Sequence, residues 1–425
     1  MGDKPRSDEH YVTPDQLCMG LHVHLDLSWV DHPFTFSSFK IKTLDQIATI
    51  QSLGLTRIRY SPTRSDTEPL AEPVAPTAPP PAVDHEADPL YLAKRERLAR
   101  LEAQRAKSAS CEKEFLSSTK AIKSIQQNMF SQPALVRQQA DELVKSMTDS
   151  MLMDVDIAIQ LMADKVGNED VYYHALNVTL LSMMLAKEMK APAAAIHLLG
   201  LAALFHDAGE ADIPDRITHK TEALTRAEAS LLQQHCAYGV DVAKKLGLPP
   251  ETQTAIFQHH EHADGSGYPK GPQAGPLSLL SRIIAIVNTY DELCNPANPA
   301  RALTPHEALS TMYAQQRARF DPLAMTTFVR CMGVYPPGTI VALSNGVLAM
   351  VVSVNASRPL KPTVIVYDPA VRKSEAIVVD LELEPDVTVS KTLKPQQLPA
   401  AVFEYLSPRK RTTYYFNAET GKSQG

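Results

Sequence analysis

The apolar residues between Pro133 and Gly333 recur with the period of an α-helix, for instance in DVDIAIQLMADK, ALNVTLLSMMLAKEM and LLSRIIAIVNTYDEL. One run, from Pro192 to Phe205, is almost entirely apolar. It is too short to cross a bilayer, so it predicts a helix buried in a protein core. A chain with this pattern over its middle half can only be built around a helical domain, and the sequence therefore predicts a mainly α fold.

Two helix starts in this region carry clear signals. Thr225 with Glu228 and Thr304 with Glu307 have the spacing of a capping box, in which each side chain binds a backbone N–H group at the helix start. Pro305 stands at the first helical position after Thr304, where its missing N–H group costs nothing. We expect helices to begin at both places.

The segments on either side have a different pattern. Residues 8–62 contain the short β-type runs GLHVHLDL and TRIRY and one helix-like stretch, LDQIATIQSLG, which predict a small α+β amino-terminal module. Residues 336–408 contain GTIVALSNGVLAMVVSVN, PTVIVYD and EAIVVDLE, which predict a small β-rich carboxy-terminal module. Residues 409–425 form a mostly polar tail that we expect to be loose.

Two segments join the amino-terminal module to the helical domain, which is expected over residues 133–335. Residues 63–88 are rich in proline and acidic residues and predict an extended linker. Residues 89–132 are rich in Ala, Lys, Arg, Glu and Gln and predict a charged helical connector. Sustained heptads are absent, so pairing of this helix in a homodimer and a solvated helix that only links domains both stay open.

Composition limits the classes of partner and location. The net charge is −6, with 21% charged and 44% hydrophobic residues, which leaves no global basic surface for long nucleic acid. The start MGDKPRSDEH is polar and no apolar segment is long enough to span a membrane. The five cysteines show no CxxC spacing, and we expect them to be reduced thiols. These features predict a cytoplasmic protein.

Histidines and one aspartate in the central region suggest a metal site. They are His174, His206, Asp207, His235, His259 and His260. Imidazole and carboxylate groups bind iron, manganese and zinc, and a site with more than one ion needs several such groups. A single buried histidine is more often a core residue, but five in one helical region favour the metal site.

The adjacent His206 and Asp207 in LFHDAGE resemble the pair that names the HD superfamily of metal-dependent phosphohydrolases. The later run QHHEHADGSGYPKG resembles the signature of the HD-GYP family, including the distance from His259-His260-Glu261 to Gly267-Tyr268-Pro269. The segment VTPDQLCMGLHVHLDLSWVDHPFTFSSFKI resembles the domain of unknown function that often precedes bacterial HD-GYP domains, notably in Trp29 through Phe34.

The resemblance implies a helical bundle in which two or three divalent transition metal ions, with iron or manganese favoured, activate water to hydrolyse cyclic di-GMP to pGpG or GMP. It also implies partnership with GGDEF-domain proteins. The implied metal ligands are Asp170, His174, His206, Asp207, His235, His259 and His260, with Asn288 at the position of a further family ligand. We expect His206 and Asp207 to be catalytic, together with Glu210, which departs from the family pattern. The implied substrate contacts are Gly267, Tyr268, Pro269, Lys270, Arg282 and Arg301.

Three positions depart from the family pattern. Glu210 stands where the family has a lysine near the substrate phosphate, Asn288 where it has an aspartate ligand, and NPANPAR, ending in Arg301, where it has Arg-Pro-Tyr-Arg. Two alternatives to cyclic di-GMP hydrolysis stay open: a degenerate module that binds cyclic di-GMP or a partner without hydrolysis, and a phosphohydrolase for another nucleotide.

The sequence allows two interpretations of Glu210. If Ala203 through Glu210 continue one helix, the Glu210 carboxylate lies on the face of His206 and Asp207 and replaces the charge lost at Asn288. The alternative is a solvent-facing glutamate, because Gly209 favours the end of a helix.

Overall fold

The computed structural model describes residues 10–27, 31–71, 89–153, 158–161, 170–271, 276–354, 358–369, 371–373, 376–406 and 414–417. Trp29, most of the proline-rich linker and most of the tail lie outside these residues. The chain divides into two compact units. The first contains residues 1–105 together with 345–347 and 367–377, and the second contains the remainder.

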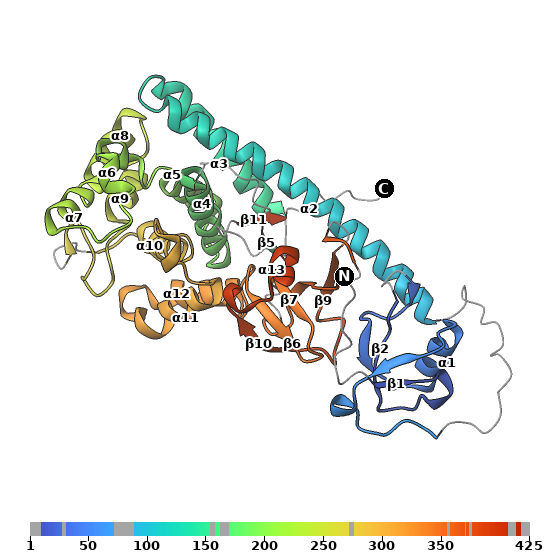
Figure 1. Ribbon diagram of the computed structural model, residues 1–425. Coiled ribbons are helices and arrows are strands. Elements are labelled where there is room, and N and C mark those ends of the chain that lie inside the picture. Colours follow the sequence, from blue (N-terminus) through green and yellow to red (C-terminus); the bar gives the residue numbers. More distant parts are fainter. Residues whose placement is uncertain are drawn as a thin grey trace, which may run out of the picture. The chain divides into compact units, whose positions relative to one another are not determined.

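The amino-terminal module of the first unit is a small antiparallel sheet with one helix (Figure 1). Its strands β1 (His10–Val12), β2 (His22–His24), β3 (Ser38–Lys40) and β4 (Ile58–Tyr60) lie in the order β1-β4-β2-β3. Helix α1 (Leu44–Ser52) begins at Thr43, whose side chain accepts a hydrogen bond from the Gln46 N–H group. The buried core includes Leu21, Val23 and Ile50, so the predicted α+β arrangement is confirmed.

Two loops from the carboxy-terminal part of the chain complete the first unit. Arg64 Nη1 donates a hydrogen bond to the Asn345 carbonyl oxygen at 2.9 Å, and Ser37 Oγ donates one to Asp368 Oδ2 at 3.3 Å. Gly346 fits beneath Arg64, because a Cβ atom there would lie 2.6 Å from the guanidinium. Residues nearly 300 positions apart therefore pack in one unit.

The charged segment forms one long helix, α2 (Pro89–Asn128), and α3 (Pro133–Met153) follows it after a short turn. This confirms the predicted helix. The first residues of α2 belong to the first unit, where the buried Lys94 donates a hydrogen bond to the His32 carbonyl oxygen.

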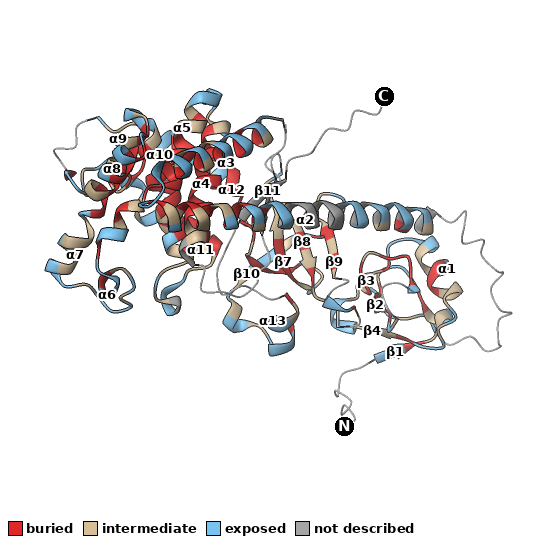
Figure 2. Ribbon diagram, turned by 90° about the horizontal axis from the view of Figure 1, so that it is seen from above, coloured by how far each residue is buried: buried red, intermediate tan, exposed pale blue. Residues whose placement is uncertain are grey.

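The helical domain confirms the mainly α fold. Its helices are α4 (Asp170–Glu188), α5 (Ala193–Leu204), α6 (Asp215–Thr218), α7 (Arg226–Leu232), α8 (His235–Lys245), α9 (Pro250–Gln258), α10 (Leu279–Cys294), α11 (Pro305–Gln315) and α12 (Pro322–Met332). Figure 2 shows the buried residues gathered where α3, α4, α5 and α10 meet. The apolar run from Pro192 is helix α5, with a buried second half. Both predicted capping boxes are present at α7 and α11.

The carboxy-terminal module contains a five-stranded sheet in the order β10-β6-β7-β8-β9. Its elements are β6 (Ile340–Leu343), β7 (Leu348–Ser353), β8 (Thr363–Val366), β9 (Ile377–Asp380), β10 (Val389–Leu393) and α13 (Ala400–Leu406). Strands β6 and β7 pair antiparallel on either side of Asn345-Gly346, a dipeptide that favours tight hairpin turns. The predicted β-rich module is confirmed.

Two local expectations were wrong. DVDIAIQLMADK was expected to be helical, but Ala158–Leu161 within it forms strand β5. Tyr414–Asn417, in the tail expected to be loose, forms strand β11, which pairs antiparallel with β5. The aromatic Tyr-Tyr-Phe sequence favours an extended strand, and the pairing satisfies the backbone of both segments.

No helix among the described residues is both long and apolar enough to cross a membrane. Cys18, Cys236, Cys294 and Cys331 are free thiols, as expected, and the Cys111 side chain lies outside the described residues.

Candidate metal centre

The candidate ligands lie mainly at helix ends. His174 lies in the second turn of α4, His206 and Asp207 follow α5, His235 begins α8, and His259 follows α9. Helix ends leave backbone groups unpaired and bring side chains close to neighbouring elements. The chain fold therefore directs residues from four separate segments to one place.

A glycine makes one of these approaches possible. Gly209 lies in the 3₁₀ helix Ala208–Asp212, immediately after the His206-Asp207 pair. A Cβ atom at Gly209 would lie 2.1 Å from the His235 carbonyl oxygen and 2.4 Å from the Gly239 nitrogen. Only a residue without a side chain lets this segment pack against α8 and bring Asp207 to His235.

Three of the imidazole rings are oriented by backbone carbonyl groups. The Nδ1 atoms of His206, His235 and His259 lie 2.7, 2.6 and 2.6 Å from the carbonyl oxygens of the residues three positions earlier. A carbonyl oxygen can only accept a hydrogen bond, so each Nδ1 atom carries the hydrogen. In the neutral ring the lone pair is then on Nε2, the atom that can bind a metal.

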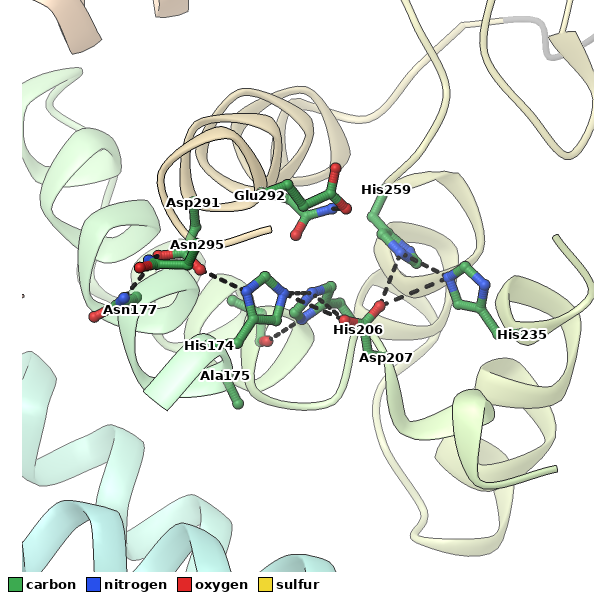
Figure 3. A network of polar contacts seen from close by, with 12 residues as sticks. His174, Ala175, Asn177, His206, Asp207, His235, His259, Asp291, Glu292 and Asn295 are labelled. Carbon is green, nitrogen blue, oxygen red and sulfur yellow. Dashed lines mark hydrogen bonds and ion pairs between the residues drawn. The ribbon is translucent and has the colours of Figure 1, made fainter. Parts of the chain in front are cut away.

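These Nε2 atoms converge on Asp207 (Figure 3). Asp207 Oδ2 lies 3.3 Å from His174 Nε2 and 3.0 Å from His206 Nε2. Asp207 Oδ1 lies 3.7 Å from His235 Nε2 and 3.5 Å from His259 Nε2. Each oxygen of one carboxylate thus faces a different pair of histidines.

The ligand atoms form two sets, in each of which all atoms lie within 4.8 Å of one another. The first set, which we call the three-residue set, is His174, His206 and Asp207, and the second, the four-residue set, is Asp207, His235, His259 and His260. Asp207 belongs to both. A carboxylate with one oxygen in each set is suited to bridge two ions.

The distances between paired nitrogens support a cation at this place. His174 Nε2 lies 3.2 Å from His206 Nε2, and His235 Nε2 lies 3.1 Å from His259 Nε2. Two nitrogen lone pairs at such distances repel each other unless a proton or a metal ion lies between them. Imidazole and carboxylate donors in these numbers fit divalent transition metals.

The protonation of the site also suits metal binding. Burial, followed by the charges of His259 and His235, lowers the pKa of His260, and burial lowers the pKa of His259 to about 4. Burial opposes charge on Asp207, but His206 and hydrogen bonds from the surrounding histidines hold its pKa well below the usual range. A neutral imidazole and an ionised carboxylate are the forms that bind metal.

Asp291 in α10 is a functional candidate that the sequence patterns missed. It is buried, and its Oδ2 atom lies 2.7 Å from His174 Nδ1. Asn177 and Asn295 donate hydrogen bonds to Oδ1 at 2.6 and 3.0 Å. Burial opposes charge on His174, but its hydrogen bonds to Asp207 and Asp291 outweigh that effect and raise its pKa. The sequence signal that could have identified Asp291 is the amide of Asn295 four positions later, a spacing that lets the two side chains interact on one helix face.

The loop that contains Gly267, Tyr268 and Pro269, which we call the GYP loop, packs against the candidate ligand His260. The Tyr268 ring stacks on the His260 ring with centroids 4.5 Å apart. A Cβ atom at Gly267 would lie 2.3 Å from the His260 carbonyl oxygen. Both carboxylate oxygens of the buried Glu261 accept backbone hydrogen bonds, from Lys270 at 2.7 Å and from Gly271 at 3.0 Å. The loop is therefore fastened at both sides of the Tyr268-Pro269 pair.

Among the described residues, the predicted ligand Asn288 and the predicted catalytic residue Glu210 lie outside the two sets. Asp170 begins α4, but its side chain lies outside the described residues. Asn288 is buried and donates a hydrogen bond to Glu292 Oε1 at 3.0 Å. The helix premise for Glu210 was wrong, because α5 ends at Leu204 and Glu210 lies in the next 3₁₀ helix. Burial and then the Asp207 charge raise the pKa of Glu210 to about 8.

The predicted cationic substrate contacts are spread over the surface. Lys270 is exposed, with its ammonium group 5.7 Å from the Phe257 ring centroid. Arg301 is exposed in a short 3₁₀ helix. Arg282 Nη1 pairs with Asp321 Oδ2 at 2.5 Å and lines a hollow of about 730 Å³ beside the GYP loop.

Comparison with known families gives the domain composition. Residues 140–323 match the HD domain, residues 11–159 match a domain of unknown function (DUF3391), and residues 340–401 match the KOW domain associated with HD domains. The helical region is an HD domain. The resemblance inferred from His206-Asp207 and from the amino-terminal module is thereby confirmed.

Relatives of the HD domain are found in several bacteria. The cyclic di-GMP phosphodiesterase PA4108 of Pseudomonas aeruginosa is 31% identical over 54% of this chain and 55% of its own length. The cyclic di-GMP phosphodiesterase PdeB of Borreliella burgdorferi is 25% identical over 44% and 50%. The chain thus matches about half the length of these relatives. The solved protein Bd1817 of Bdellovibrio bacteriovorus is 14% identical, with a TM-score of 0.40 over 76% of this chain and 98% of that one.

Proposed function

We propose that the HD domain is a metal-dependent phosphodiesterase that hydrolyses cyclic di-GMP to pGpG or GMP. The observation that carries the proposal is the convergence of four imidazole Nε2 atoms on the two oxygens of Asp207. Divalent ions bound there would lower the pKa of a shared water and offset the negative charge that develops at phosphorus. The cytoplasmic location and the homodimer stay predictions.

The metal ligands follow from the two sets. His174 and His206 would hold one ion, and His235, His259 and His260 would hold the other, with Asp207 shared. Iron and manganese suit mixed imidazole and carboxylate donors. Two ions account for the ligands that the structure brings together, while Asp170 and Asn288 stay proposed ligands for these ions or for a third.

The other residues of this chain have defined tasks in the proposal. Asp291 holds the His174 ring in position, and His206 and Asp207 would hold the metal ions that activate the water. Tyr268 covers the His260 ring and offers a hydroxyl group near the site. Lys270, Arg282 and Arg301, with the backbone of Gly267 and Pro269, stay proposed contacts for the phosphates of the dinucleotide.

The choice of substrate is supported by the names of the relatives. PA4108 and PdeB are named cyclic di-GMP phosphodiesterases, whereas a Vibrio cholerae relative, 29% identical over 38% of this chain and 35% of its own length, is named a 3′3′-cGAMP-specific phosphodiesterase. We favour cyclic di-GMP because several relatives with that name match this chain. GGDEF-domain proteins stay proposed partners.

The test is turnover by the purified chain loaded with Mn²⁺ or Fe²⁺ under anaerobic conditions. Cyclic di-GMP and 3′3′-cGAMP are supplied separately, and products are separated by chromatography. We expect pGpG or GMP from cyclic di-GMP at the higher kcat/KM. Binding of cyclic di-GMP without any product would favour the degenerate module, and preferential turnover of 3′3′-cGAMP would overturn the proposed substrate.

A further inference from the structure

His174 is held in a different way from the other oriented histidines of the site. The Nδ1 atoms of three rings contact backbone carbonyl oxygens three positions earlier, and these rings are His206, His235 and His259. His174 Nδ1 instead contacts a side chain of another helix, the Oδ2 atom of Asp291 in α10. A backbone carbonyl group is fixed by its own segment, whereas a carboxylate can rotate about its side-chain bonds. The orientation of the His174 ring therefore depends on what holds Asp291.

Two amide side chains hold the Asp291 carboxylate. Asp291 is fully buried, and its ion-pair partner among the described residues is His174 rather than a lysine or an arginine. Asn177 Nδ2 donates a hydrogen bond to Asp291 Oδ1 at 2.6 Å, and Asn295 Nδ2 donates one to the same oxygen at 3.0 Å. Figure 3 shows the carboxylate between these amides and the His174 ring. Rotation of the carboxylate would break both hydrogen bonds, so Oδ2 stays directed at His174 Nδ1.

The two amides differ in position and in exposure. Asn177 is 1% exposed and lies three positions after His174, so one face of α4 presents both side chains to Asp291. Asn295 follows the end of α10, four positions after Asp291, and is partly exposed. Its backbone N–H group also donates a hydrogen bond to the Asp291 carbonyl oxygen at 2.7 Å. Water replaces a lost donor more easily at a partly exposed position than in the interior, so we expect Asn177 to contribute more than Asn295.

We propose that Asn177 and Asn295 are positioning residues of the metal centre. They hold Asp291 so that its Oδ2 atom accepts the Nδ1 hydrogen of His174, which directs His174 Nε2 to Asp207 Oδ2, 3.3 Å away. Partners that orient a metal-binding imidazole tune the affinity for the ion. This inference rests on the proposed metal centre and adds two residues to it. The alternative is that the amides only satisfy a buried carboxylate, in which case they affect folding stability and not the ion.

The test is Mn²⁺ binding by the full-length chain after removal of metal, measured by electron paramagnetic resonance of free Mn²⁺. Asn177→Leu keeps the approximate size of the side chain and removes its donor. Loss of an outer partner weakens metal affinity roughly 10–100-fold, and because Asn177 acts through Asp291 we expect a fall of about 10-fold. Asn295→Ala should give a smaller fall. Asn128→Ala in α2 is the matched control and should leave the affinity unchanged, because Asn128 Nδ2 likewise donates a hydrogen bond to a residue four positions earlier, at 2.8 Å.

A double variant separates positioning from stability. In the Asp291→Ala background the amides have no carboxylate to hold, so Asn177→Leu should cause no further loss of Mn²⁺ affinity. Residues that act as one unit give non-additive effects of this kind, whereas independent residues give additive effects. Urea unfolding of each metal-free variant records the effect on stability separately. A purely structural role would lower that stability and leave the Mn²⁺ affinity of the folded variants unchanged.

The outcomes separate this inference from the proposed function. If the unchanged chain binds no Mn²⁺, the metal centre is wrong and the two amides lose their role with it. If the unchanged chain binds Mn²⁺ and folded Asn177→Leu binds it equally well, the positioning role is wrong while the metal centre stands. An equal loss from Asn177→Leu with and without the Asp291 carboxylate also overturns the role. Should circular dichroism show that Asn177→Leu is unfolded, the same comparison with Asn295→Ala, at the partly exposed helix end, decides in its place.

Discussion

His174 Nδ1 and Asp291 Oδ2 lie 2.7 Å apart, and this contact joins α4 to α10 inside the helical domain. The contact fixes which ring nitrogen of His174 faces Asp207. Carboxylates that orient metal-binding imidazoles in this way tune metal affinity without touching the ion. Asp291 therefore belongs to the site, although it contacts only a ligand.

Replacing Asp291 by Asn removes the charge and keeps the size of the side chain. We expect Mn²⁺ affinity to fall roughly 10–100-fold, as for other carboxylate partners of metal-bound histidines. Binding titrations measure this. Arg330→Gln, on an exposed residue of α12, is a control for general effects of a charge change. Unchanged affinity in Asp291→Asn would show that the contact has no influence on the ion.

The His206→Ala and Asp207→Ala variants remove one ligand from the three-residue set and the shared ligand from both sets. We expect both variants to lose metal and turnover, with Asp207→Ala losing both ions because it belongs to both sets. Metal analysis of the purified proteins provides the measurement. His219→Ala, on an exposed histidine outside the site, is the matched control. Turnover that survives in both variants would remove these residues from the active site.

The stability of the metal-free protein should depend on pH through His259. Its folded pKa of about 4 lies below the ordinary value of 6.5, so between these values the unfolded chain binds more protons. The contribution of neutral His259 is therefore fully present above pH 6.5 and is lost as the pH falls towards 4, by up to about 1.4 kcal/mol per pH unit. Urea unfolding between pH 4 and 7 should give a steeper slope for the unchanged protein than for His259→Gln. Equal slopes would contradict the assignment.

Glu261→Gln tests the fastening of the GYP loop. A glutamine accepts only one of the two backbone hydrogen bonds and places an NH₂ group against the other donor. We expect a loss of roughly 2 kcal/mol in the free energy of unfolding, because a buried hydrogen bond to a charged group is lost. Denaturant unfolding measures it, with Glu251→Gln as the control. A higher KM for cyclic di-GMP with little change in kcat would show that the loop contacts the substrate.

Glu210→Lys tests whether Glu210 supplies charge to the metal centre. If the Glu210 carboxylate is a ligand, the single variant should lose metal and turnover, and Glu210→Lys with Asn288→Asp should recover both. Metal content and cyclic di-GMP turnover of the two variants give the answer. If Glu210→Lys keeps its metal and raises turnover, Glu210 is no ligand and the natural residue attenuates the enzyme.

The sequence predicted the elements whose signals are local. The capping boxes and the apolar run of α5 depend on neighbouring residues, and the structure contains them. The histidines were found because their residue type restricts their chemistry. Asp291 was missed because its role depends on which helix lies opposite α10, which no local pattern specifies.

The same limit explains the two errors of secondary structure. Strands β5 and β11 stabilise each other across about 250 residues of sequence, so neither is evident from its own segment. At Glu210 the sequence left two alternatives open, and the structure excludes the one in which a single helix runs through Glu210, because α5 ends at Leu204.

The contacts of Arg64 with Asn345 and of Ser37 with Asp368 bear on how the protein could be dissected. A single break after Ala71 would divide the polypeptide, yet the released segment would still be held by loops that emerge from the carboxy-terminal sheet. A fragment that lacked the amino-terminal module would conversely present the Asn345 carbonyl and the Asp368 carboxylate without these two donors. The amino-terminal module thus shares its compact unit with two short loops from the other end of the sequence.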